Sequence, residues 1–84
     1  SREDQLAFTW AAYNAGPRKV ADMRRHAEEM GLDPNRWFQN VEYAALDLVG
    51  REPVRYVSNI YKYYVAYRLS HNLALARDAS RQML

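Results

Sequence analysis

Cysteine is absent from this chain of 84 residues, so it forms neither a disulfide nor a thiolate metal site. Glycine and proline are scarce, at three residues each, and build no flexible linker or low-complexity tract. No apolar run approaches the ~20 residues that a membrane-spanning helix needs. Neither sign of charge dominates: 12 basic and 10 acidic residues are mixed along the chain, which argues against a nucleic-acid binder with a concentrated basic face.

Motifs for metal, nucleotide or nucleophilic chemistry are missing as well. His26 and His71 lie far apart and lack partners at ligand spacing, so no metal site is expected. No Ser-His-Asp arrangement, phosphate loop or nucleotide motif occurs. The sequence therefore implies no cofactor.

Aromatic side chains, by contrast, are plentiful, with seven tyrosines and two tryptophans among the 49% of residues that are hydrophobic. Such rings offer flat apolar faces with a polar edge, which suits a sugar-binding groove. They also fill helical cores, and we expect most of them to do so. Composition alone leaves both roles open.

Apolar residues recur with a helical period, which predicts an all-α chain of about four helices. We expect helices near residues 3–15 and 18–30, a third capped by Asn40, and a long last helix from about Glu52-Pro53 almost to the end of the chain. Asp33-Pro34 is expected to cap and begin a short helical turn. The faces expected to be buried are Leu6, Trp10 and Tyr13; Val20, Met23, Ala27 and Met30; Val41, Ala44, Ala45, Leu48 and Val49; and Val57, Ile60, Tyr64 and Tyr67, continued by Leu69, Leu73 and Ala76.

The segment Ala11–Pro17 is the most informative part of the chain. It places a tyrosine and an asparagine where a helix stops, because Gly16 can adopt the positive φ that closes a helix and Pro17 suits the first turn of the next. Taken alone, it reads as an ordinary corner between two helices. Its residues, AAYNAGP, also resemble the "AYN" motif of the lysozyme-like soluble lytic transglycosylase domain, which cleaves peptidoglycan glycan strands. We call Ala11–Pro17 the first motif.

A second motif, Gly50–Ile60, resembles the later motif of the same family, in which a glutamate and usually a threonine precede Tyr-Val-x-x-Ile. Pro53 replaces that threonine. Residues 31–42 and 59–67 are similar to membrane-bound lytic transglycosylases of the F type. The resemblance covers roughly residues 5–70 and implies the C-terminal half of a lysozyme-like catalytic domain. We therefore expect residues 1–70 to be that half-domain and 71–84 to be a helical C-terminal extension without an assigned function.

The catalytic acid of the family is missing from this chain. In the family it is a glutamate followed by serine, shortly before a Gly-Leu-Met-Gln stretch, and neither pattern occurs here. Glu42 lacks the following serine, and its place in the first turn of a helix has a sufficient structural reason. We expect no catalytic residue in this chain, with the acid on polypeptide upstream.

The resemblance implies three site residues. Tyr13 and Asn14 would border the groove and bind substrate, since an amide both donates and accepts hydrogen bonds. Tyr56 would support catalysis by orienting the acid. The structural alternatives are a helix-capping Asn14 and a core Tyr56. Glu52 could also contact the site, but the favoured interpretation is a glutamate that stabilises the first turn of its helix.

Charged residues of the second expected helix allow two interpretations. Arg24 and Arg25 could pair with Glu28 and Glu29 at helical spacing. Together with Arg18 and Lys19, these arginines could also meet an acidic partner, such as the carboxylates of peptidoglycan stems or an anionic membrane surface. An ordinary solvated face is the favoured interpretation.

For the parent protein, the resemblance implies a peptidoglycan lyase of the bacterial cell envelope, on the periplasmic side and attached to the outer membrane through the absent part. The expected partners are glycan strands and the missing N-terminal half of the domain, with no nucleic acid, and the isolated piece is expected to self-associate and to be inactive. The alternative function is a non-catalytic helical module that binds protein or glycan through its aromatic surface.

Overall fold

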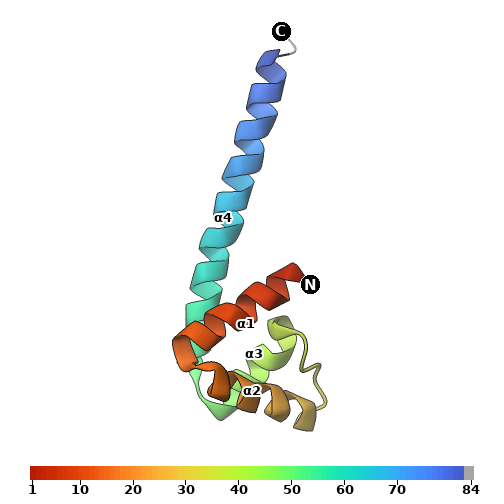
Figure 1. The fold of residues 1–84 in the computed structure, drawn as a ribbon, viewed down its shortest axis with the longest axis vertical. Helices are drawn as coiled ribbons and strands as arrows, with labels where there is room; N and C mark the ends of the chain where they lie inside the picture. Colours follow the sequence, from red (N-terminus) through yellow and green to blue (C-terminus); the bar gives the residue numbers. More distant parts are fainter. Residues whose placement is uncertain (83–84) are drawn as a thin grey trace.

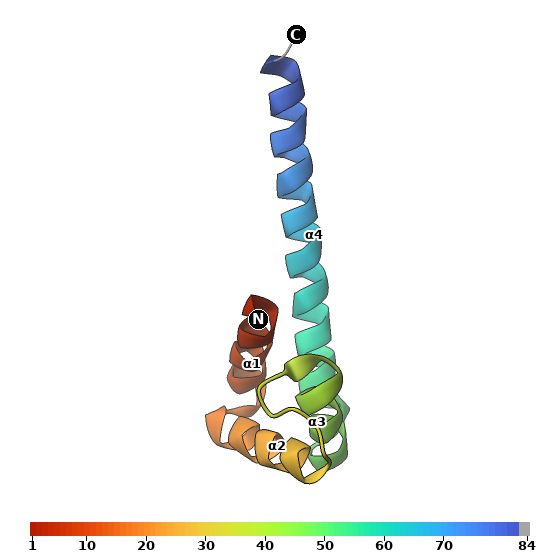
Figure 2. The ribbon, with the colours of Figure 1, turned by 90° about the vertical axis from the view of Figure 1, so that its right-hand side faces the viewer.

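The computed structural model describes residues 1–82, which form α-helices and no strand (Figure 1). The helices are α1 (Arg2–Ala15), α2 (Pro17–Glu29), α3 (Glu42–Leu48) and α4 (Arg51–Gln82). This confirms the all-α architecture of about four helices with a long last one. α1, α2, α3 and the first turns of α4 form a packed body, from which the rest of α4 projects, giving extents of 57 × 21 × 17 Å (Figure 2).

The corner between α1 and α2 forms as its residues predict. Gly16 ends α1 with a φ of 92°, and its N–H donates to the Ala12 carbonyl at 2.8 Å. Pro17 then begins α2, where its missing N–H costs no hydrogen bond. The chain therefore reverses within a single residue and brings α2 against α1.

The connection from α2 to α3 differs from the prediction. Asp33 begins no helix; its carboxylate accepts the Asn35 N–H at 2.8 Å, which closes a turn instead. A wide turn, η1 (Trp37–Val41), follows, in which Phe38 and Gln39 depart from helical backbone angles and Gln39 has a φ of 63°. Asn40 does not cap α3: its side chain accepts from the Asp33 N–H at 2.9 Å and donates to the Phe38 carbonyl at 3.1 Å, so that it braces the loop.

The core lies where the four helices meet, and alanine supplies much of it. Its buried apolar residues are Ala7, Ala11, Val20, Met23, Ala27, Trp37, Val41, Ala44, Ala45 and Val57. The predicted inner faces of α2, α3 and the start of α4 are correct at Val20, Met23, Ala27, Val41, Ala44, Ala45 and Val57.

Other predicted core positions were wrong. α1 turns Ala7 and Ala11 inward, because their small side chains let it approach the core closely, so Leu6 and Trp10 are only half-buried and Tyr13 is 84% exposed. Met30, Leu48 and Val49 stand at helix ends and are exposed. Ile60 and Tyr64 are half-buried, and Tyr67, Leu69, Leu73 and Ala76 are exposed because α4 has left the body by then.

A buried carboxylate ties the start of α1 to η1. Asp4 Oδ1 accepts the Trp37 backbone N–H at 3.0 Å, and its Oδ2 accepts the Ser1 hydroxyl at 2.8 Å. Burial alone would raise the pKa of Asp4, but the hydrogen bonds from Ser1, Trp37 and Phe38 together lower it below the usual value. Asp4 is therefore ionised at neutral pH and holds the two segments together.

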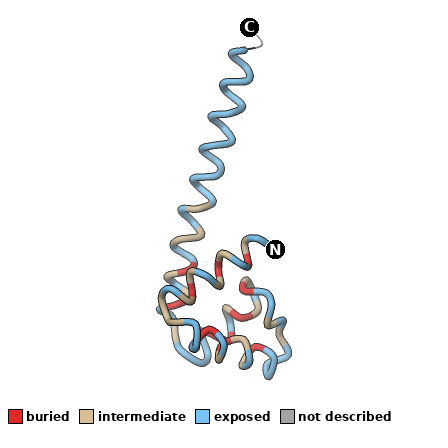
Figure 3. The backbone as a smooth tube through the Cα atoms, in the orientation of Figure 1, coloured by how far each residue is buried: buried red, intermediate tan, exposed pale blue. Residues whose placement is uncertain are grey.

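The outer part of α4 has no cover in the described part of the chain. Every residue from Val65 to Gln82 is exposed (Figure 3). The outermost ion pair between α4 and the body within residues 1–82 joins Arg68 to Glu3 at 3.7 Å, and we call residues 69–82 the free end of α4. The helical extension expected over 71–84 is helical through Gln82, while residues 83–84 lie outside the described residues.

Two further properties concern residues 1–82 as a whole. None of their helices combines the length and apolar character needed to cross a membrane. Their histidine, aspartate and glutamate side chains also form no cluster of three that could hold a metal ion.

Candidate functional site

The two motifs, some forty residues apart in sequence, meet at one place in the fold. The end of α1 lies beside the start of α4, where the chain passes from α3 through Gly50 (Figure 1). A cavity of about 300 Å³ lies between them, and we call it the site cavity. Its lining residues are Asn14, Ala15, Lys19, Val49, Gly50, Arg51, Glu52 and Pro53.

Tyrosines from the two motifs pair next to this position. The rings of Tyr13 and Tyr56 lie 6.5 Å apart at an interplanar angle of 16°, in a stacked arrangement. Tyr13 is largely exposed and Tyr56 half-buried, so neither belongs to the core. The pair presents an aromatic surface to solvent of the kind that sugars contact.

Asn14 is not the residue that ends α1. Gly16 is the C-cap, and its backbone N–H makes the capping bond to Ala12. Asn14 lines the site cavity, and its side-chain amide makes no hydrogen bond within residues 1–82. Its donor and acceptor are thus available to a ligand.

Glu52 and Pro53 form the opposite side of the cavity. Glu52 is exposed in the first turn of α4, where the helix dipole favours a carboxylate. Pro53 is fully buried in that same turn, whose backbone N–H groups have no partner within the helix. The replacement of the family's threonine thus keeps the turn and removes a hydroxyl from it.

The arginines of α2 bind other partners than those predicted. Arg24 does not pair with Glu28; its guanidinium donates to the Pro34 carbonyl at 2.9 Å and to Asn35 Oδ1 at 2.8 Å. Arg25 pairs with Asp22 rather than with Glu29. Both arginines are thus engaged within the chain, whereas Lys19 lines the site cavity.

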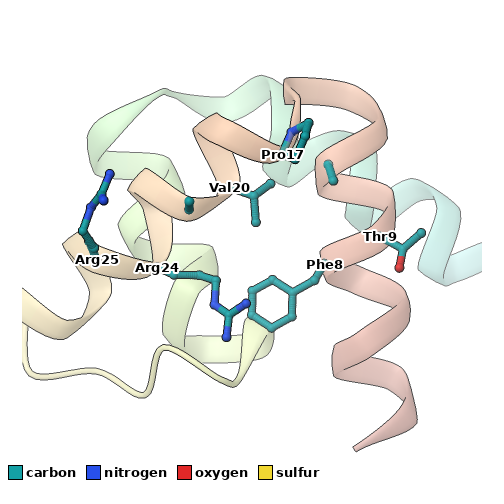
Figure 4. Close-up of a pocket in the computed structure, with 8 residues that line it drawn as sticks. Phe8, Thr9, Pro17, Val20, Arg24 and Arg25 are labelled. Carbon is teal, nitrogen blue, oxygen red and sulfur yellow. The ribbon is translucent and has the colours of Figure 1, made fainter.

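A second cavity, of about 520 Å³, lies between α1 and α2 on another part of the body. Phe8 and Val20 point into it, and the Arg24 guanidinium lies 4.9 Å from the centre of the Phe8 ring (Figure 4). Thr9 and Arg25 line its rim (Figure 4). Its apolar lining fits packing against further polypeptide better than polar recognition.

A row of aromatic rings runs along the contact of α4 with α1 and η1. The sequence did not predict this row as a unit. Phe38 meets Tyr61 at 4.7 Å, Tyr61 meets Tyr64 at 6.3 Å, and Tyr64 meets Trp10 at 5.9 Å between ring centres. The spacing of Tyr61 and Tyr64 on one helix was the available signal. These four rings close the side of the body beneath α4.

Two carboxylates of the body, those of Glu42 and Asp4, have structural partners. Glu42 accepts the Gln39 N–H at 3.1 Å, which stabilises the strained backbone of that residue. The pKa of Asp4 is lowered, whereas a general acid needs a raised one. Asp4 is also ten residues, about 15 Å, from Asn14 along α1.

Comparison with known proteins supports the motifs. The chain is 38% identical over 73 aligned positions to the membrane-bound lytic murein transglycosylase F of Desulfosudis oleivorans, a match that covers 71% of this chain and 16% of that protein. The protein of that name from Marinobacter nauticus is 38% identical, over 73% of this chain and 15% of its own length. The one from Stutzerimonas stutzeri is 36% identical over the same shares. No family model and no solved structure matches the chain.

An all-helical chain that brings both motifs to one cavity, and whose relatives bear this name, is related to the lytic transglycosylases. Within that class it resembles part of the membrane-bound murein transglycosylases F, as its motifs predicted. The matched region spans only 15–16% of the length of these relatives.

Proposed function

We propose that this chain is part of a peptidoglycan lytic transglycosylase and forms one wall of its glycan groove. The observation that carries the proposal is the meeting of the two motifs around the site cavity, with Asn14 on its lining and Tyr13 stacked on Tyr56 beside it. The two motifs are some forty positions apart in the sequence, so their proximity is a product of the fold. The corresponding substrate is the bond between N-acetylmuramic acid and N-acetylglucosamine.

The proposed reaction needs one carboxyl group. A protonated glutamate gives its proton to the glycosidic oxygen, and the resulting carboxylate then removes the proton of the muramic 6-hydroxyl as that oxygen attacks the anomeric carbon. The glycosidic bond breaks, a 1,6-anhydro end forms, and no water is added. This differs from glycosidases that use two carboxylates.

The residues of this chain would serve that reaction by positioning. The free amide of Asn14 can hold an N-acetyl or hydroxyl group of the strand. The Tyr13–Tyr56 pair supplies an aromatic contact for a sugar face, and the Tyr56 phenol can orient the acid. The acid itself belongs to the upstream half of the domain, so the isolated chain would be inactive.

Exposed apolar side chains support a missing partner half. Tyr43, Leu46, Leu48 and Val49 stand 40–45% exposed on and beside α3, near the site cavity. Apolar groups gathered on one short helix are typical of a covered surface. We propose that the N-terminal half of the domain covers these side chains and that the isolated chain self-associates through them. We also propose that the parent protein acts in the cell envelope on the periplasmic side and is attached to the outer membrane through another part.

Substitutions in the parent enzyme test the site. Asn14→Ala and Tyr56→Phe should lower turnover of purified sacculi at least about tenfold, the effect of losing one transition-state contact of about 1.4 kcal/mol. Asn72→Ala and Tyr63→Phe, at exposed positions of α4, are the matched controls and should leave turnover unchanged. Full activity of a site variant would remove that residue from the proposed site.

A second experiment tests the division of labour. The 84-residue chain, incubated with sacculi, should release no anhydromuropeptides, and adding the upstream half of the domain should restore release. Release by the chain alone would show that the acid lies within it and overturn the proposal.

A non-catalytic interaction module is the alternative function. It is favoured by the exposed rings of Tyr63 and Tyr67, at 74% and 71%, on the outer part of α4. Light scattering separates the two functions: an independent module stays monodisperse alone, whereas a half-domain self-associates until its other half is added.

A further inference from the structure

The site cavity carries more charge than the binding of a neutral sugar explains. Lys19 from α2 and Arg51 from α4 both line it, together with one carboxylate, that of Glu52. The two cations are distant in sequence and are brought to one cavity by the same corner that brings the motifs together. Asn14, on α1, lines the same cavity.

These two cations have no partner within residues 1–82. Some other arginines are engaged by the chain itself, since Arg25 and Arg68 form ion pairs and Arg24 forms hydrogen bonds. Lys19 and Arg51 take part in none of the ion pairs or side-chain hydrogen bonds of this part of the chain. Their charges remain available to a bound anion.

Helix stability does not explain their positions either. Lys19 stands in the first turn of α2, which contains no acidic residue, and Arg51 is the first residue of α4. The helix dipole disfavours cations at these places. Residues that break a local rule without a structural gain are expected at functional sites.

We propose that the site cavity binds a carboxylate of the peptidoglycan strand, with Lys19 and Arg51 as its ligands, while Asn14 holds the adjoining sugar. This inference rests on the proposed function and names the part of the substrate that the cavity takes. The apolar lining from Ala15, Val49 and Pro53 fits the methyl groups that accompany such carboxylates in a lactyl ether or an alanyl stem. Of the four basic residues of α2, only Lys19 lines this cavity, and Arg51 supplies the second charge.

The test uses the parent enzyme, with its catalytic glutamate replaced by glutamine so that no strand is cleaved, and three soluble tetrasaccharides, with binding followed by calorimetry. One probe is neutral chitotetraose, one is a peptide-free GlcNAc–MurNAc tetrasaccharide with its lactyl carboxylates, and one carries stem peptides. We expect the carboxylate-bearing probes to bind more tightly than chitotetraose and to lose that advantage as salt is raised. Tighter binding of the peptide-free probe than of the stem-bearing probe identifies the lactyl carboxylate as the ligand, because that carboxyl group is an amide where a stem is attached. The opposite order identifies a carboxylate of the stem.

Lys19→Gln and Arg51→Gln should each weaken binding of the preferred anionic probe about two- to fivefold, the range of an exposed ion pair, without changing chitotetraose binding. Arg77→Gln, on the exposed free end of α4, is the matched control. Unchanged affinity in both variants would overturn the carboxylate site.

The two proposals fail in different ways. If all three probes bind equally and Asn14→Ala weakens them all, the glycan wall stands and the carboxylate site is wrong. If anionic probes bind through Lys19 and Arg51 but Asn14→Ala has no effect, the carboxylate site stands and the place of Asn14 in the wall is wrong. If none of the three probes binds, both the glycan wall and the carboxylate site are wrong.

Discussion

The packed body and the free end of α4 are both helical, yet only the body is held by contacts. In the body, alanines at positions such as Ala7, Ala11 and Ala44 are completely buried because helices cross there at close range. In the free end, Leu69, Leu73 and Leu75 are 54–59% exposed. Several large apolar side chains therefore lie outside the core, while small alanines fill much of it beside Trp37 and Met23.

This contrast shows that a helical period does not establish what covers a helix. An isolated helix of about 12–15 residues is marginal in water, because most helical stability in proteins comes from packing. The order of the free end is thus expected to depend on a partner surface, whereas that of the body depends on its own core and on Asp4.

The largest effect should come from the carboxylate that joins the start of α1 to η1. Asp4→Ala leaves the buried N–H of Trp37 without an acceptor, and we expect a loss of about 2–3 kcal/mol in the free energy of unfolding, measured by urea denaturation. Asp78→Ala, on the free end, is the matched control and should change stability little. Equal losses from the two substitutions would show that the body and the free end do not differ in how far their side chains stabilise the fold.

The same carboxylate predicts a dependence on acid. Because its pKa is lowered in the folded protein, its contribution is complete above the ordinary value of 3.8 and is lost as the pH falls through the folded pKa. Asp4→Ala should therefore flatten the decline of stability at the acid end of the pH profile.

A smaller effect is expected from two valines on the same helix. Val57 is completely buried and Val65 is 45% exposed. Val57→Ala should lower the free energy of unfolding by about 2 kcal/mol, through lost burial and a residual cavity. Val65→Ala should lower it by less than about 1 kcal/mol. A large loss at Val65 would mean that the outer part of α4 is packed in solution, as in a self-associated chain.

The helices could be predicted because the residue types at their ends, glycine and proline, indicate where a helix stops or starts. Gly16, Gly31 and Gly50 all adopt positive φ values at helix ends, and Pro17 starts α2. The inner face of α1 could not be predicted, since the large residues Leu6, Trp10 and Tyr13 share a stripe as regular as that of Ala7 and Ala11. Only the distance to the neighbouring helix decides between them, and that distance is a property of the whole fold.

The loop between α2 and α3 shows a related limit. Asp33 and Asn40 have the side chains of helix caps, but both bind backbone groups of the loop itself. Side chains of this type stabilise caps and turns by the same hydrogen bonds, so their identity does not distinguish the two.

The site residues could likewise be predicted only in part. Tyr13, Asn14 and Tyr56 could be proposed from the motifs, and their roles remain predictions. Lys19 was one of four similar cations in the sequence, and Arg51 was not considered. Their shared cavity depends on the corner between α1 and α2 and on the turn at Gly50, which no local pattern relates to each other.

The smallest of the expected effects compares the two histidines, one in each region. His26 Nε2 lies 2.7 Å from Asp47 Oδ2, which joins α2 to α3, and its Nδ1 lies 3.5 Å from Glu29; the hydrogen bond to Asp47 chiefly raises the pKa of His26 above 6.5. The stabilisation is therefore complete below the ordinary pKa and is lost as the pH rises through the raised one. His26→Gln should remove this decline in urea denaturation between neutral and mildly alkaline pH, and Asp47→Asn should do the same. His71→Gln should leave the profile unchanged, because His71 is exposed on the free end and stacks only on Tyr67 of its own helix. If the free energy of unfolding of His26→Gln still declines with rising pH, another group causes the pH dependence. The bond between His26 and Asp47 then does not stabilise the fold.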